Sequence, residues 1–241
     1  MKVKIIKSPN HSLKPRIAKK IKFIIIHYTG MQSEGESIKR LVNKKNKVSA
    51  HYLINRKGSL IKMVEENKVA WHAGKSRWKN FINLNDHSIG IELVNKGHKL
   101  GYENFSSKQI KKLILLCKFL IKKYRIKKNN ILGHSDIAPQ RKDDPGEKFP
   151  WQLLSFNKIG YWHNNRKKKE IYGIKKTDLR RHFFNNLYKI GYRYFDKKRS
   201  SGSDFKVTKA FQSRFRQNKV NGRIDEECLQ ISHKLAHSMK N

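Results

Sequence analysis

Five polar residues have the types and the spacing needed for hydrolysis, namely His27, Glu92, His134, Lys142 and Asp144. His27 ends the β-branched run KFIIIHYTG, and His134 opens the loop GHSDIAPQRKDDPG, which also contains Asp144. Because the carboxyl ends of neighbouring strands meet at one edge of a sheet, these three side chains could converge. Two imidazoles and one carboxylate, with a fourth position left for water, are typical of a catalytic zinc site.

The other two groups would complete the chemistry of amide hydrolysis. Zinc lowers the pKa of a bound water to about 7. Glu92 can take a proton from that water and return it to a leaving amine, while Lys142 can hold the oxyanion that forms on a carbonyl. The residues alone leave alternatives open. A strand-end histidine is commonly a packed or surface residue, an Asp before Pro-Gly is commonly a turn residue, and Glu92 could face solvent.

Apolar periodicity predicts the elements that must position these groups. The run over 22–30 is typical of a central strand buried on both faces. The alternation in SIGIELVN predicts a strand over 88–95 that places Glu92 and Gly90 on one face. The other expected elements are a helix over 36–45, a hairpin over 51–64, a helix over 106–124 capped by Ser106 or Ser107, and a short strand within 129–136. Strands interspersed with helices predict an α/β fold.

A change of pattern after about residue 155 predicts a second domain. The run RKKKE interrupts the periodicity, and three amphipathic segments follow over 178–190, over 205–215 and after the expected N-cap Asp225. Three helices of this length form a small bundle. We therefore expect a catalytic domain over 1–155, a linker over 156–175 and a three-helix domain over 176–241.

The charge of the chain limits its partners. Lys and Arg number 56 against 18 Asp and Glu, which gives a formal net charge of +38. This positive charge would attract nucleic acid, an anionic membrane surface or an anionic wall polymer. The basic residues are spread along the chain, and no recognition helix, RNP motif or zinc finger is visible, so we expect no specific nucleic-acid partner.

Other features bear on compartment and assembly. No apolar run is long enough to span a bilayer. The N-terminal segment lacks a secretory apolar region, which favours the cytoplasm, with the periplasm or cell envelope as the alternative. Cys117 and Cys228 lie in helical patterns and are expected to be unpaired core residues. We expect a monomer.

Five motifs carry a resemblance to a known family. They are HYTG (27–30), SAHYLI (49–54), WHAG (71–74), NDHSIGIELVN (85–95) and GHSDIAPQRKDDPGEKFPW (133–151). Over about residues 20–155, their order and spacing resemble those of the zinc-dependent N-acetylmuramoyl-L-alanine amidases of type 2. The resemblance implies a mixed central β-sheet flanked by helices. It also implies one Zn²⁺ per chain at His27, His134 and Asp144, with Glu92 and Lys142 as the catalytic pair.

The implied substrate is peptidoglycan or a muropeptide, cut at the amide between the lactyl group of (anhydro-)N-acetylmuramic acid and L-alanine. The segments RKxDPG and FPW resemble the Gram-negative branch that acts on muropeptides in cell-wall turnover or recycling. The alternative is a non-catalytic peptidoglycan-recognition protein, although such family members lack the zinc set, which is present here.

The chain departs from the family at Asp143, where Thr is common, so Asp143 competes with Asp144 as the ligand. Asp144 is preferred because it precedes Pro-Gly, and Asp136 is a weaker rival because its spacing from His134 differs. We expect four further residues to contact substrate, namely His51, Trp71, His72 and Arg77. The remaining histidines without a constellation, His98 among them, are expected on the surface.

The C-terminal segment also carries a resemblance. LYKIGYRYF, VTKAFQSRF and VNGRIDEECL are similar to the elements of the three-helix peptidoglycan-binding domain. The match is partial, because Cys228 replaces a usual Thr and Asn221 a usual Asp. Binding of the polymer is therefore implied less firmly than the fold, and a packing module that supports the catalytic domain is the alternative.

Overall fold

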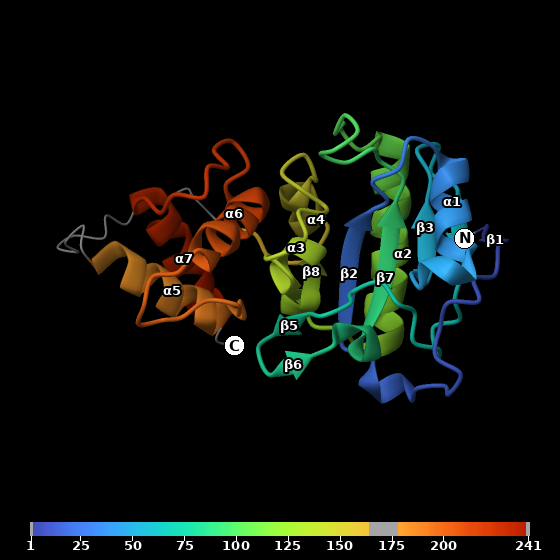
Figure 1. Ribbon diagram of the computed structural model, residues 1–241, viewed down its shortest axis with the longest axis horizontal. Helices are drawn as coiled ribbons and strands as arrows, with labels where there is room; N and C mark the ends of the chain where they lie inside the picture. Colours follow the sequence, from blue (N-terminus) through green and yellow to red (C-terminus); the bar gives the residue numbers. More distant parts are fainter. Residues whose placement is uncertain (1, 164–177, 240–241) are drawn as a thin grey trace.

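The computed structural model describes residues 2–163 and 178–239, and its centre is a six-stranded mixed sheet (Figure 1). The strand order is β1-β4-β3-β7-β2-β8, in which only the β3–β4 pair is antiparallel. The strands are β1 (Lys4–Ile5), β2 (Phe23–Tyr28), β3 (Tyr52–Ile54), β4 (Leu60–Lys62), β7 (Ser88–Leu93) and β8 (Ile131–Gly133). A separate hairpin pairs β5 (Arg77–Trp78) with β6 (Phe81–Ile82).

Helices surround the sheet, so the expected α/β fold with a mixed central sheet is confirmed. The helices are α1 (Glu34–Val42), α2 (Ser107–Tyr124), α3 (His134–Ile137), α4 (Trp151–Phe156), α5 (Leu179–Ile190), α6 (Ser203–Phe215) and α7 (Glu226–Ser238). Short 3₁₀ turns lie at Ala18–Lys20, Lys44–Asn46, Leu84–His87 and Lys128–Asn130. No helix in the described residues has the length and apolar character needed to cross a membrane.

Most of the elements expected from periodicity are present. The helix α2 begins after Ser106, whose side chain accepts a hydrogen bond from Gln109 N, as expected for an N-cap. The helix expected over 36–45 instead begins at Glu34, because Ser33 caps it, and ends at Val42. The hairpin over 51–64 is formed by β3 and β4. The two-residue strands β1, β5 and β6 and the short helices α3 and α4 were not expected.

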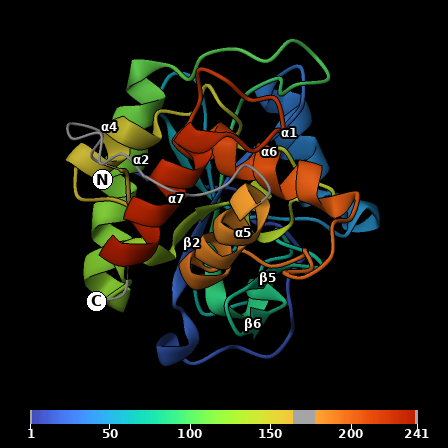
Figure 2. The ribbon, with the colours of Figure 1, turned by 90° about the vertical axis from the view of Figure 1, so that its left-hand side faces the viewer.

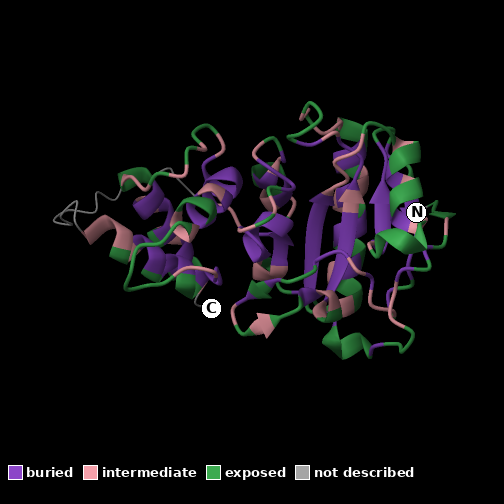
Figure 3. Ribbon diagram, viewed as in Figure 1, coloured by how far each residue is buried: buried purple, intermediate pink, exposed green. Residues whose placement is uncertain are grey.

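The two faces of the sheet are covered differently. On one face, α2 packs Leu113 and Cys117 against Ile24 and Ile91, in a core cluster built from alternate strand residues. β2 and β7 are paired in parallel along their whole length, and all of their residues except Tyr28 and Glu92 are buried (Figure 3). This burial accounts for the uninterrupted β-branched run in β2.

The opposite face is covered by α1 toward one edge and by the C-terminal helices toward the other (Figures 1 and 2). Leu41 of α1 packs with Leu53 and Ile61 in one cluster. The C-terminal helices place Phe183, Phe211 and their neighbours in a single cluster with residues of the sheet domain. One apolar core therefore extends from the sheet into the helical bundle.

The bundle itself follows the expected pattern. Asp225 caps α7 by accepting a hydrogen bond from Cys228 N. Cys117 and Cys228 are both buried and unpaired, as expected. Residues 164–177, which include most of the expected linker over 156–175, lie outside the described residues, and α4 occupies the start of that range. The division into two domains at this point stays a prediction.

Candidate active site

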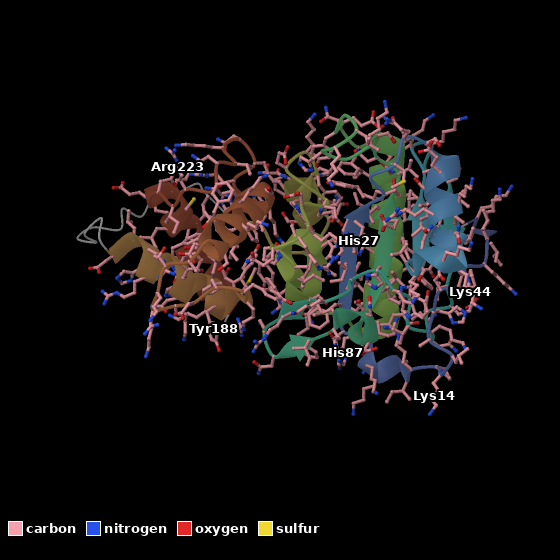
Figure 4. All side chains as sticks on the ribbon, in the orientation of Figure 1. Lys14, His27, Lys44, His87, Tyr188 and Arg223 are labelled. Atoms are coloured by element: carbon pink, nitrogen blue, oxygen red, sulfur yellow. The ribbon has the colours of Figure 1, made fainter. Side chains whose placement is uncertain are left out.

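The candidate site lies where β2, β7 and β8 end, on the face of the sheet opposite α2. In the parallel register of β2 and β7, His27 is the direct partner of Glu92. His134 follows β8, which pairs with the other edge of β2, and is the first residue of α3. Figure 4 shows His27 on β2, in the interior of the molecule. Two adjacent strands and one strand-to-helix junction thus bring the side chains of His27, Glu92 and His134 close together.

The loop after α3 brings Asp144 to the same point. Ser135 N donates a hydrogen bond of 2.8 Å to Asp144 O, which folds the loop back onto α3. Asp144 Oδ2 lies 3.0 Å from His27 Nδ1 and 3.1 Å from His134 Nδ1, and the two nitrogens are 3.0 Å apart. All three side chains are buried, and together they form a group that could hold a metal ion.

The tautomer of His27 follows from a chain of hydrogen bonds that ends at a backbone carbonyl. Ser88 Oγ donates to Leu84 O, so it must accept from His72 Nε2 at 3.2 Å. His72 Nδ1 is then an acceptor, and His27 Nε2 donates to it at 3.0 Å. Burial, followed by the neighbouring His134, lowers the pKa of His27 to about 4, so this imidazole is neutral near pH 7. Its Nδ1 therefore carries a free lone pair.

His134 is oriented in the same way. Its Nε2 lies 3.1 Å from Ala73 O and 3.3 Å from Arg141 Nη2, which donates to the same carbonyl. Because the carbonyl can only accept, the tautomer with the proton on Nε2 satisfies it and leaves a lone pair on Nδ1. Burial by itself raises the pKa of Asp144, but His134 and His27 lower it below the ordinary range, so the carboxyl is ionised. Three acceptors that face one another at about 3 Å repel unless a cation lies between them. The chemistry of the donor set therefore fits a divalent metal such as zinc.

Glu92 is placed beside this group without a hydrogen-bond partner of its own. Its Oε2 is inaccessible to solvent and has no partner among the described residues, although the side chain as a whole is partly exposed to the cavity. Burial, followed by the charge of Asp144, raises the pKa of Glu92 to about 8. A carboxyl that exchanges a proton near neutral pH, next to a metal-ligand set, has the properties of a general base and acid.

These groups line a cavity of about 340 Å³. Lys142 lines it together with four further cationic residues, Arg40, Lys96, Lys99 and Arg141. The cationic lining residues therefore favour a substrate that carries carboxylates. The same cavity also contains the metal-ligand set and the proton-exchanging carboxyl of Glu92.

Of the four residues that we expected to contact substrate, two line the cavity and two do not. Trp71 and His72 line the cavity, but both ring nitrogens of His72 are hydrogen-bonded, Nδ1 to His27 and Nε2 to Ser88. His51 does not line it. The ring of His51 is fully buried, it accepts from Gly90 N at 3.0 Å, and it lies 2.9 Å from the Arg16 guanidinium.

Arg77 is also outside the cavity, since it lies exposed on β5. The sequence placed it near Trp71 along the chain, but the β5–β6 hairpin carries it away from the strand ends. The geometry thus supports substrate contact for Trp71 alone among the four, and a role behind the metal ligand for His72.

The rival carboxylates do not join the two histidines. Asp143 is exposed and lies 3.8 Å from Lys209 Nζ of α6. Asp136 is buried, but its oxygens accept hydrogen bonds from Gly133 N, Arg214 and Tyr192. Only Asp144 joins the two histidines in the described residues, which agrees with the choice made on the Pro-Gly signal.

Sequence reasoning missed one histidine at the cavity. His98 is exposed, as expected, but it is not isolated, because it lines the cavity and lies 2.9 Å from Tyr28 OH and 3.0 Å from Glu147 Oε2. These contacts join the loop after β7 to the end of β2 and to the loop that carries Asp144. The only local signal is the glycine on each side of the HKL segment, since Gly97 and Gly101 both adopt positive φ angles.

Comparisons with known proteins show which family the sequence resembles. Residues 17–147 match the N-acetylmuramoyl-L-alanine amidase family. The amidase AmiD of Escherichia coli is 37% identical over 231 residues, which cover 90% of this chain and 82% of AmiD. The 1,6-anhydro-N-acetylmuramyl-L-alanine amidase AmpD of Escherichia coli is 43% identical over 105 residues, which cover 44% of this chain and 55% of AmpD. The match thus spans about half the length of AmpD.

Solved structures show the same likeness. AmiD of Escherichia coli, in complex with anhydro-N-acetylmuramic acid-L-Ala-D-γ-Glu-L-Lys, has a TM-score of 0.80 at 34% identity, covering 95% of this chain and 92% of that one. AmpDh3 of Pseudomonas aeruginosa, in complex with anhydromuramic pentapeptide, has a TM-score of 0.81 at 29% identity, covering 97% and 98%. The family match covers more than half of the chain and the likeness to AmiD nearly all of it, so the chain belongs to the N-acetylmuramoyl-L-alanine amidase family.

Proposed function

We propose that this amidase hydrolyses the bond between the lactyl group of anhydro-N-acetylmuramic acid and L-alanine, with one Zn²⁺ held by His27 Nδ1, His134 Nδ1 and Asp144. The observation that carries the proposal is the convergence of three acceptor atoms within 3.0–3.1 Å beside the unpaired Glu92 Oε2. The relatives solved with anhydro-muropeptides support the substrate class.

When bound, zinc acts as a Lewis acid and makes water nucleophilic near neutral pH. Glu92 is placed to accept the proton that this water loses, because its Oε2 has no competing partner. The protonated carboxyl is then the favoured form in its buried position, and its proton is available to the amine of L-alanine as the amide bond breaks. One residue thus serves as base and then as acid.

Lys142 supplies positive charge on the same wall of the cavity. An ammonium group that lines a partly enclosed site stabilises the negative charge that develops on the carbonyl oxygen, more strongly than it would in water. The neighbouring cations, Arg40, Lys96 and Lys99, face the same space. We infer that they attract the carboxylates of a stem peptide, such as the one in the AmiD complex.

Product analysis tests the proposal. The purified protein is incubated with soluble anhydro-muropeptide and, separately, with intact sacculi. Each incubation is run once with zinc and once with chelator, and the products are identified by mass spectrometry. We expect free stem peptide beginning in L-alanine from the soluble substrate, with loss of this release in chelator. Zinc binding at one per chain without release from either substrate would instead favour a recognition protein. Release from sacculi alone would assign the activity to the intact wall.

A further inference from the structure

The helix that carries His134 is held by a buried carboxylate. Asp136 lies two residues after His134 on α3 and is 1% exposed. Its Oδ2 accepts a hydrogen bond of 2.8 Å from Gly133 N, the backbone group immediately before His134. The side chain of Asp136 therefore fixes the first turn of α3, and with it the direction in which the His134 ring leaves the backbone.

The other partners of this carboxylate come from the C-terminal helices. Arg214 of α6 donates to Asp136 Oδ2 and, through a second nitrogen, to Ile131 O of β8 at 2.9 Å. Tyr192, which follows α5, donates its hydroxyl proton to Asp136 Oδ1. Arg214 is 3% exposed and stacks over Trp151 at 4.2 Å, so the pair is enclosed by protein on all sides.

A second set of contacts holds the loop between α3 and Asp144. Gln140 donates from Nε2 to Tyr194 O at 3.1 Å, and Lys206 Nζ of α6 donates to Gln140 O at 2.8 Å. Lys142 is two residues further along this loop. The segment that bears His134, Lys142 and Asp144 is thus attached to the bundle at its beginning and in its middle.

We propose that Arg214 and Tyr192 are positioning residues of the amidase site, through which the C-terminal helices set the geometry of His134. The inference rests on the proposed function only in taking His134 as a metal ligand. A buried carboxylate needs a paired charge, so without Arg214 the Asp136 side chain is no longer held in place. Its movement frees Gly133 N and the first turn of α3. The bundle then belongs to the catalytic unit, whether or not it also binds glycan.

Zinc affinity, measured by competition with a chelating dye, tests this without relying on hydrolysis. The variants are Tyr192→Phe, which removes one hydroxyl, and Arg214→Met, with Arg214→Lys as the conservative rescue. Arg216→Met is the matched control, because Arg216 is also 3% exposed and follows α6 but pairs with Asp225 inside the bundle. Thermal unfolding of each variant reports stability separately.

We expect Tyr192→Phe and Arg214→Met to weaken zinc binding by about 10- to 100-fold, as for other residues that support metal ligands. Arg214→Lys should recover part of the loss, and Arg216→Met should lower stability with unchanged zinc affinity. If Arg214→Met does not fold, the zinc affinity of Tyr192→Phe alone tests the proposal. Unchanged zinc affinity in Tyr192→Phe, or an equal loss in Arg216→Met, would overturn the proposal. Absence of zinc binding by the unaltered protein would instead overturn the proposed function.

Discussion

At the scale of single residues, Glu92 combines a raised pKa with an unpaired oxygen, and its removal should separate chemistry from metal binding. Gln has the same shape as Glu but cannot exchange a proton. We expect Glu92→Gln to lower kcat by about 10²- to 10⁴-fold, the usual range for loss of a general acid–base group. Zinc content, measured by atomic emission on the same sample, should stay at that of the wild type. Loss of zinc together with activity would place Glu92 among the ligands instead.

Ser88 is the last side chain of the hydrogen-bond chain that fixes the tautomer of His27. Without the Ser88 hydroxyl, the proton on His72 Nε2 has no acceptor, so the proton is no longer kept on that nitrogen. His72 Nδ1 is then not fixed as the acceptor for the proton on His27 Nε2. We expect Ser88→Ala to weaken zinc binding by about 10-fold. Ser232→Ala is the matched control, because Ser232 is an equally buried serine in α7. Isothermal titration that gives the same zinc affinity for both variants would refute the tautomer assignment.

The residues that could be predicted from the sequence are those whose role follows from position on a strand. His27, Glu92 and His134 stand at or near strand ends, where periodicity and family motifs both apply. Ser88 and His98 contribute through partners that are distant in sequence or on loops, and the glycines that flank the HKL segment mark a turn but not the role of His98. Arg77 was assigned to the cleft by proximity along the chain, and the β5–β6 hairpin removes it from there.

At the scale of elements, β7 must contain a glycine opposite the His72 ring. A Cβ at position 90 would lie 2.3 Å from His72 Cγ, and hydrogen bonds to His27 and Ser88 hold the ring in that place. We expect Gly90→Ala to reduce the free energy of unfolding by about 1–3 kcal/mol, as overpacking of a core does, and to weaken zinc binding through His72. Urea denaturation provides the measurement.

Gly202→Ala is the control for this substitution, since a Cβ there meets nothing within 4 Å. It should leave both the unfolding midpoint and the zinc affinity close to those of the wild type. A Gly90→Ala protein with wild-type stability would show that His72 is free to shift and does not hold His27 in place.

Element prediction succeeded where a segment is long enough to show a period. The six residues of β2 and β7 and the 18 of α2 have their own apolar patterns. By contrast, β1, β5 and β6 have two residues each, and pairing with distant segments defines them. The short helix α3 depends on Asp136, Arg214 and Tyr192, which no periodicity connects.

At the scale of the whole molecule, buried histidines should make the zinc-free protein sensitive to acid. Burial is the main cause that lowers the pKa of His27 to about 4, of His51 to about 3, and of His72 well below its ordinary value. The unfolded chain therefore binds more protons than the folded one below about pH 6.5, and stability falls as the pH drops from there. Glu92 acts in the opposite sense, because burial raises its pKa to about 8 and its contribution is lost as the pH rises.

Between pH 6.5 and 4.5 the three histidines outweigh the one glutamate. We expect the free energy of unfolding of the zinc-free protein to fall over this interval, with each proton contributing a slope of at most about 1.4 kcal/mol per pH unit. Urea denaturation at a series of pH values, in the presence of chelator, measures this slope. A stability that stays constant down to pH 4.5 would mean that these histidines are not buried in neutral form.

Hydrolysis in ¹⁸O-labelled water tests whether the enzyme adds water to the lactyl carbonyl and so cleaves the amide bond to L-alanine. Wild-type protein loaded with zinc is incubated with anhydro-muropeptide, and the products are fragmented in the mass spectrometer. We predict one ¹⁸O atom in the lactyl carboxylate of the anhydro-sugar, an unlabelled peptide with a free L-alanine amine, and product formation by Glu92→Gln that is slower by about 10²- to 10⁴-fold. Label in the peptide, cleavage at any other bond, or full activity of Glu92→Gln would contradict this prediction.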